Sequence, residues 1–248
     1  MRETVAVWLK DLVVGDDVSR AAWIGPLLGG EFGAVGRTVP RGYGAYARIC
    51  HPTADRDGWP TKWSEVAAAT GRRAHPLMQW HSLVGSSDPV NIAGSTWPGP
   101  NPQRGNLQPD VLIALCELLD VHTATPEDCC FCLWEGYGWL DGGPAPAFTA
   151  EELSRPRLEL PHRSYLLLTG ALAAASKIVR PPFRQSPNLF WAADRAWCAA
   201  TELDFDSTLV AGTAELIDAI LKSPAFDAWP VQPDDSLAAD ADTINAIA

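Results

Sequence analysis

Eleven tryptophans are the feature that most constrains how this chain can fold. Trp is large and amphipathic, so its side chain either fills a hydrophobic core or lies at a surface that a partner covers. Glycine, proline and charged residues surround three close pairs of Trp, which is more typical of a pocket rim or an interface than of a core strand. The pairs are Trp59 with Trp63, Trp134 with Trp139, and Trp191 with Trp197. They predict a recognition protein without naming what it recognises.

The charge balance disfavours several classes of partner. The chain has 248 residues, 47% of them hydrophobic, which is enough for one large core or two small ones. Its net charge of -11 makes binding to nucleic acid or to an anionic membrane unfavourable. A basic protein partner, or an acidic surface that only keeps the chain soluble, fits better. The start lacks a leader pattern and no apolar run could span a bilayer, so we expect a cytoplasmic protein.

Cysteine and glycine patterns do not predict a metal, nucleotide or other cofactor. In the cytoplasm the six cysteines are expected to be thiols rather than disulfides. Cys129 and Cys132 have the C-x-x-C spacing of many zinc sites, but no second ligand pair follows at a standard distance. Buried thiols are therefore the preferred interpretation. Gly30, Gly33 and Gly36 lack the phosphate-loop pattern and the helix that would follow it.

Helical and extended patterns alternate along the chain and predict an α+β fold with a mixed, largely antiparallel sheet and packed helices. Thr149 and Glu152 have the spacing of a capping box, and Thr213 is a predicted N-cap of a later helix. A strand is expected around Trp80, and turn residues at 204–207 favour an antiparallel strand pair. Further strands are expected over 4–14, 45–50, 130–137, 164–168, 196–203 and 208–211, and helices over 18–28, 61–70 (N-cap Thr61) and 110–122.

Domain organisation is less clearly marked. A soft boundary near Gly142-Gly143-Pro144 would separate an N-terminal part, 1–143, from a C-terminal part, 144–230, although one continuous domain also fits. Residues 231–248 are small and acidic, and we expect a loosely ordered tail. The segment from Arg37 to Arg73, both included, has seven basic residues, so docking of the tail on this segment is an alternative.

The densest group of candidate site residues lies within 188–204. Asp194 and Arg195 lie between two tryptophans, where Arg can stack on an indole and bind a carboxylate or phosphate. An Asp-Arg turn with Trp packed beneath it is the structural alternative. On a strand, Glu202 and Asp204 would share one face, where they can hold a hard cation or do acid–base work. They can equally form a solvated face with Arg195 or another basic group opposite.

Two stretches resemble other proteins. Trp191-x-x-Asp194-Arg195-x-Trp197, followed by Thr201-Glu202-x-Asp204, resembles a pattern in a family of high-GC actinobacterial proteins with no assigned activity. Cys132-Leu-Trp-Glu-Gly-Tyr-Gly-Trp139 is similar to a second stretch of the same family. The resemblance implies a bacterial source and no function.

Three functional hypotheses follow. The first is a non-catalytic protein-binding protein, immunity-like or inhibitor-like, that contacts its partner through Trp-lined surfaces. Its candidate binding residues are Trp134, Trp139, Trp191, Asp194, Arg195, Trp197, Glu202 and Asp204. The second is an enzyme with a pocket around Asp194, Arg195, Glu202 and Asp204. The third is a small-molecule or sugar-binding module, because Trp faces stack on flat or apolar ligand surfaces.

Overall fold

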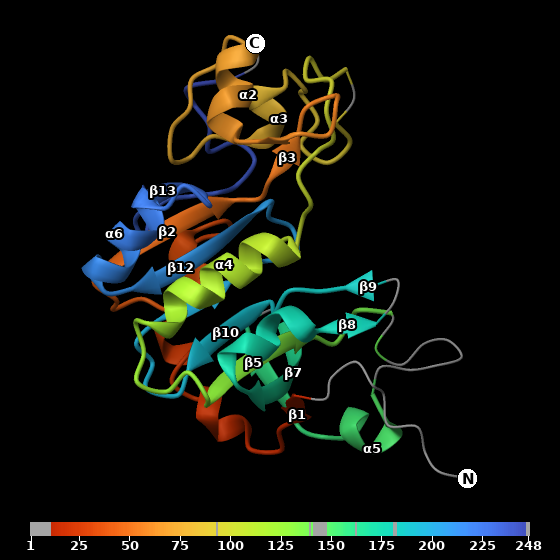
Figure 1. Cartoon of the computed structure of the whole chain (residues 1–248), viewed down its shortest axis with the longest axis vertical. Coiled ribbons are helices and arrows are strands. Elements are labelled where there is room, and N and C mark those ends of the chain that lie inside the picture. Colours follow the sequence, from red (N-terminus) through yellow and green to blue (C-terminus); the bar gives the residue numbers. More distant parts are fainter. Residues whose placement is uncertain are drawn as a thin grey trace.

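A nine-stranded sheet runs through the protein in the order β1-β7-β5-β10-β11-β12-β2-β13, and β6 also pairs with β7. The computed structural model describes residues 11–92, 94–138, 140, 148–161, 163–180 and 183–246. Each pairing within the sheet is antiparallel, and β1 and β6 pair with opposite ends of β7. Helices pack against the sheet (Figure 1). The predicted α+β class with a largely antiparallel sheet is confirmed.

The described strands and helices have the following bounds. The sheet contains β1 Leu12–Val14, β2 Ala45–Cys50, β5 Cys129–Trp134, β6 Arg157–Leu160, β7 Arg163–Gly170, β10 Leu189–Ala192, β11 Cys198–Ala200, β12 Ser207–Gly212 and β13 Asp227–Val231. Two small hairpins are β3 Thr53–Ala54 with β4 Pro60–Thr61, and β8 Val179–Arg180 with β9 Phe183–Arg184. The α-helices are α1 Val35–Thr38, α2 Trp63–Ala69, α3 Trp80–Leu83, α4 Pro109–Asp120, α5 Ala150–Leu153 and α6 Ala214–Lys222. The 3-10 helices are η2 Val18–Ala21, η3 Gly25–Leu27 and η4 Leu172–Lys177.

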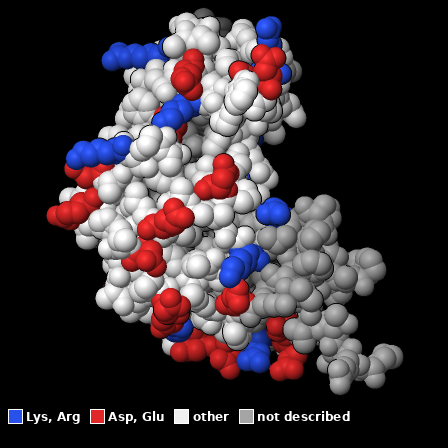
Figure 2. Space-filling view, viewed as in Figure 1, with Lys and Arg blue, Asp and Glu red and all other residues white. Residues whose placement is uncertain are grey.

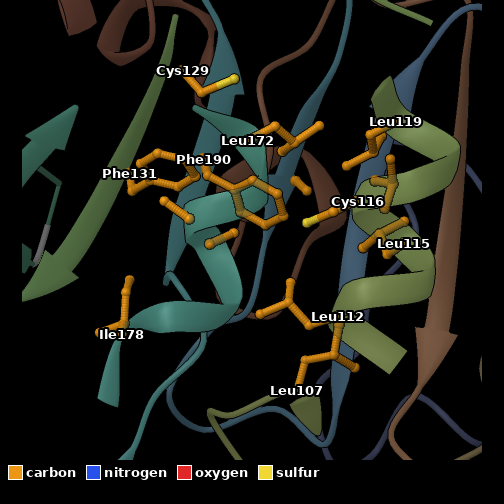
Figure 3. Packing of buried hydrophobic residues seen from close by; sticks show 14 of the residues in the cluster. Leu107, Leu112, Leu115, Cys116, Leu119, Cys129, Phe131, Leu172, Ile178 and Phe190 are labelled. Atoms are coloured by element: carbon orange, nitrogen blue, oxygen red, sulfur yellow. The ribbon is translucent and has the colours of Figure 1, made fainter. Parts of the chain in front are cut away.

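Both faces of the sheet are buried. Successive side chains of a strand point to opposite faces, so Phe131 packs in the cluster formed with α4, α6 and η4, whereas Cys130 and Cys132 pack on the other face. Figure 3 shows Leu115 and Leu119 of α4 turned toward the sheet on the first of these faces. A third cluster holds α2 and α3, which lie beyond the end of β2 (Figure 1). Covering both faces requires apolar residues at successive strand positions.

Local signals position the two longest helices. Pro109 stands at the first turn of α4, and Val111, Leu115 and Leu119 recur at helical spacing on its buried face. Thr213 caps α6 by accepting a hydrogen bond from the backbone N–H of Leu216 at 3.2 Å. The predicted capping box before α5 is also present. These helix predictions are confirmed. No described helix is long and apolar enough to cross a membrane.

Several predicted elements differ from the structure. Residues 18–28 form the 3-10 helices η2 and η3. Trp80 begins α3 rather than lying on a strand, because Trp80, Leu83 and Val84 recur at helical spacing and are buried in one cluster. The cap of α2 is Lys62, one residue after the predicted Thr61. β11 covers only part of 196–203. Of the strand expected over 4–14, only the end from 11 lies in the described residues.

The predicted N-terminal and C-terminal parts share one sheet. β2 pairs with β12, and β5 pairs with β10, so strands from both sides of the proposed boundary alternate in space. One hydrophobic cluster contains residues of both parts. The boundary itself, at 142–144, lies outside the described residues. Strands and core residues from both predicted parts therefore contribute to one sheet and one hydrophobic cluster.

The C-terminal tail is docked on the protein. Asp234 forms an ion pair with Arg41 at 2.6 Å, and the side chain of Asn245 accepts the backbone N–H of Arg73 at 2.9 Å. The side chain of Asp242 is fully buried. The expectation of a loosely ordered tail is wrong for residues 231–246, and the alternative of docking on the basic segment describes the structure. Burial and hydrogen bonds hold the segment, and its composition does not reveal them.

Candidate functional site

Two cavities adjoin where β11 turns into β12. The first chamber has a volume of about 310 Å³ and is lined by residues that include Arg163, Asn188 and Glu202. The second chamber, of about 280 Å³, is lined by residues that include Arg48, His81, Arg104 and Asp206. Phe32, Asp204 and Phe205 line both chambers. Such volumes lie at the lower end of those of small-molecule sites. Together the two chambers form the cleft.

An arginine with two carboxylates dominates the first chamber. Nη2 of Arg163 lies 2.6 Å from Oε1 of Glu202 and 3.1 Å from Oδ2 of Asp204. Arg163 begins β7, whereas the two acids lie in the turn between β11 and β12. The guanidinium also lies over the ring of half-buried Trp134, 5.5 Å from its centroid. The predicted pairing of these acids with a basic group is therefore present, but its partner is Arg163 and not Arg195.

Hydrogen bonds of Asn188 stabilise the wall of the first chamber. Its side chain is buried and donates to the hydroxyl of Tyr137 at 2.9 Å, and its Oδ1 accepts the backbone N–H of Trp134 at 2.9 Å. The backbone N–H of Thr201 donates to the carbonyl of Asn188 at 2.8 Å. These bonds join β5, β10 and the end of β11, and so fix where the chain turns toward Glu202. No local pattern in the sequence marks this role, since the hydrogen-bond partners lie far apart along the chain.

Buried charges line the second chamber. Arg48, on β2, donates from Nη1 to the carbonyl of Met78 at 2.7 Å and from Nε to the hydroxyl of Ser207 at 3.1 Å. Its Nη2 lies 3.7 Å from Oδ1 of Asp206. Burial raises the pKa of the Asp206 carboxyl, and the charge of Arg48 partly offsets this rise. Burial lowers the pKa of His81 below its usual 6.5, so this imidazole is neutral at pH 7.

Two of the predicted binding tryptophans lie in the core. Trp191 is 1% exposed and Trp197 is fully buried, on opposite faces of the sheet. Nε1 of Trp197 donates to the carbonyl of Leu119 at 3.2 Å, so its polar atom is satisfied inside the protein. Their assignment to a binding surface is therefore wrong, because helices and loops cover both faces of the sheet. Trp139 lies outside the described residues.

Asp194 and Arg195 form a structural turn between β10 and β11. Asp194 accepts the backbone N–H groups of Ala124 at 2.7 Å and Ala196 at 3.0 Å. Arg195 has a φ of 58° and stacks over the ring of Trp23, 5.1 Å from its centroid. The alternative of an Asp-Arg turn with Trp beneath it thus describes the structure. A single pocket uniting these two residues with Glu202 and Asp204 is wrong, since the two pairs lie at opposite ends of β11.

The cysteines are free and buried, as predicted. Cys129 packs on one face of the sheet and Cys132 on the other, because they are three positions apart along β5 and successive side chains alternate between the faces. The two thiols therefore cannot bind one metal ion together. Burial raises the pKa of Cys130 to about 11, which keeps this thiol protonated at neutral pH. Within the described part of the chain, no group of three His, Cys, Asp or Glu side chains is arranged to hold a metal ion.

Because of His51, we expect the free energy of unfolding to depend on pH. It is fully buried, its Nδ1–H donates to the carbonyl of Gln103 at 2.5 Å, and its Nε2 accepts the hydroxyl of Thr208 at 3.0 Å. Burial lowers the pKa of His51 to about 4. The unfolded state therefore binds the proton first, and the free energy of unfolding should fall by about 3 kcal/mol as the pH drops from 6.5 to 4.

Urea unfolding of the wild type and of His51→Gln across this pH range measures the effect. The variant lacks the titrating ring, so its free energy of unfolding should decline less steeply between pH 6.5 and pH 4. Equal slopes for the two proteins would show that His51 does not contribute.

Comparison with protein-family models, with curated proteins and with solved structures finds no match to this chain. The resemblance to an actinobacterial family therefore stays a prediction. On the face seen in Figure 2, acidic side chains are spread over the region of α4 and α6, in keeping with the net charge of -11.

Proposed function

We propose that this protein binds a small polar molecule in the cleft, with the first chamber as its recognition site. The observation that carries the proposal is the group of Arg163, Glu202 and Asp204 on the wall of a cavity of about 310 Å³. One guanidinium and two carboxylates offer donors and acceptors in a defined arrangement. Leu28 and Leu189 contribute apolar walls. A few convergent polar groups within apolar walls are typical of small-molecule sites.

The ion pairs favour recognition over acid–base catalysis in this chamber. A general base needs a carboxylate that can take a proton from the substrate. Both Glu202 and Asp204 instead accept hydrogen bonds from Nη2 of Arg163, which occupies one oxygen of each carboxylate and fixes its direction. Planar groups held in this way suit hydrogen bonding to a ligand.

Binding of a protein partner stays a prediction. Burial of Trp191 and Trp197 removes two of the side chains on which it depended. Among the described tryptophans, Trp59 is the one with a largely exposed side chain, at 71%, and it lies in the loop between β3 and β4. It is not one of the residues that line the cleft, so the two hypotheses can be tested separately.

Isothermal titration of the protein with monosaccharides, disaccharides, amino acids, dipeptides and nucleosides tests the proposal. We expect at least one class to bind the wild type, and Arg163→Met to weaken that binding about tenfold or more, because a hydrogen bond from a charged group is lost. Arg155→Met is the matched control, since Arg155 forms exposed ion pairs with Asp16 and Glu151 and does not line the cleft.

The Arg163 variant should fold, because the side chain is 25% exposed and partly exposed ion pairs stabilise little. Binding of equal affinity in Arg163→Met and the wild type would refute the first chamber as the recognition site. Absence of binding by every class would refute the proposed function as a whole.

A further inference from the structure

The two chambers are parts of one longer cleft. Phe32, Asp204 and Phe205 line both of them, so a ligand seated in the first chamber meets the opening of the second without leaving the protein surface. A molecule that fills only one chamber would leave the polar groups of the other chamber hydrogen-bonded to water. The continuity of the lining favours an extended ligand.

Charge in the cleft is nearly balanced, in contrast to the whole chain. Four arginines and three carboxylates line the two chambers: Arg37, Arg48, Arg104, Arg163, Glu202, Asp204 and Asp206. Several of these groups already face an opposite charge, as Arg163 does with two acids and Arg48 with Asp206. A charged ligand group would compete with these pairs, whereas a hydroxyl can donate to a carboxylate and accept from a guanidinium at the same time. The balance therefore favours a neutral, hydroxyl-rich ligand.

Asp206 has acceptor capacity to offer such a ligand. The residue is 9% exposed, and its Oδ1 lies 3.7 Å from Nη2 of Arg48, which is beyond ordinary hydrogen-bond distance. A buried carboxylate is strongly stabilised by donors, and burial here raises its pKa. His81, neutral at pH 7, and Gln79 line the same chamber and add groups that both donate and accept. Ligand hydroxyls would supply donors to this wall.

Exposed apolar side chains stand at the rim. Phe32 is 72% exposed at the junction of the chambers, and Val90 is 68% exposed beside the second chamber. Gly30 and Gly33 lie on either side of Phe32 with φ values of 124° and 86°, which glycine adopts readily, so the loop that carries Phe32 can turn at both positions. Exposed apolar groups beside polar ones suit a ligand with both C–H faces and hydroxyls.

We infer that one ligand occupies both chambers and that it is an oligosaccharide of at least two rings. The first ring lies against Arg163 and Glu202, the second against Arg104 and Asp206, and Phe32 covers the link between them. This inference rests on the proposed function, to which it adds the class and the length of the ligand.

Isothermal titration with glucose, maltose, cellobiose, lactose and trehalose, and with glucose 6-phosphate and glycylglycine as charged probes, tests the inference. We expect one of the disaccharides to bind at least about tenfold more tightly than glucose, because the second ring adds hydrogen bonds to charged groups. Arg104→Gln should abolish this advantage and leave glucose binding within about twofold, since Arg104 lines the second chamber alone. Arg56→Gln is the control, because Arg56 is 77% exposed and outside the cleft.

A second pair of variants tests the rim without disturbing the fold. Val90→Ala should weaken binding of the disaccharide several-fold, whereas Val121→Ala, at a valine outside the cleft that is 76% exposed, should not. Equal affinity for glucose and every disaccharide, or Arg163-dependent binding of a charged probe alone, overturns the oligosaccharide and leaves the proposed function standing. Binding of none of these probes overturns the oligosaccharide, and the wider panel then decides the proposed function.

Discussion

Replacing Arg48 with methionine is expected to lower the free energy of unfolding by about 3–5 kcal/mol, because it removes one partner of a buried pair. Arg48 is 1% exposed and donates hydrogen bonds to the carbonyls of Pro76 and Met78 and to the hydroxyl of Ser207. The variant leaves these acceptors without their donor and the buried carboxylate of Asp206 without its nearest cation. Guanidinium chloride unfolding at pH 7 measures the loss.

Two further variants separate the causes. Arg155→Met removes two exposed ion pairs and should change the free energy of unfolding by less than about 1 kcal/mol. The double variant Arg48→Met/Asp206→Asn should recover part of the loss, since it no longer buries an unpaired carboxylate. A loss below about 1 kcal/mol for Arg48→Met would mean that water reaches the pair and that the second chamber is more open than the structure shows.

Trp197→Ala is expected to lower the free energy of unfolding by about 3–5 kcal/mol, as is usual for removal of a buried Trp. The indole is fully buried between the sheet and α4, its ring meets Phe190 edge to face at 5.7 Å, and its N–H donates to Leu119. The substitution leaves a cavity in this cluster and removes one hydrogen bond from the carbonyl of Leu119, which still accepts the backbone N–H of His122. Chemical unfolding followed by far-ultraviolet circular dichroism measures the effect.

Trp59→Ala is the matched control, and we expect it to change the free energy of unfolding by less than about 0.5 kcal/mol, because this side chain is 71% exposed. The contrast tests the assignment of tryptophans to core and surface. Similar losses for the two variants would contradict that assignment and would return Trp197 to the candidates for a binding surface.

Local signals in the sequence determined the fold class and several elements. The helical repeat of Val111, Leu115 and Leu119 predicted α4, and the cap residue Thr213 predicted α6. Residues 45–50 and 208–211 were predicted as strands and belong to the sheet as β2 and β12. Such signals depend on residues a few positions apart, so a single sequence contains them.

The candidate site was predicted only in part. Glu202 and Asp204 were identified as a pair, and the possibility of a basic partner was stated. Arg163 was not identified, because it lies 39 and 41 residues from these acids and nothing local to it marks the contact. The conformation of the acidic tail, residues 231–248, was also ambiguous, since composition does not distinguish a docked tail from a loose one.

The sequence by itself determined the α+β class, the helices α4 and α6, strands such as β2 and β12, the buried thiols and an acidic overall charge, because periodicity, caps and composition act locally or in sum. It did not mark β6, β10 or β13. Only the tertiary structure decided which tryptophans are buried, since both faces of the sheet are covered by segments distant in the chain. It also decided the cleft, whose walls come from residues 28–38, 160–165 and 188–205 in the first chamber. Long-range packing brings these segments together. No local pattern in the sequence marks which of them come into contact.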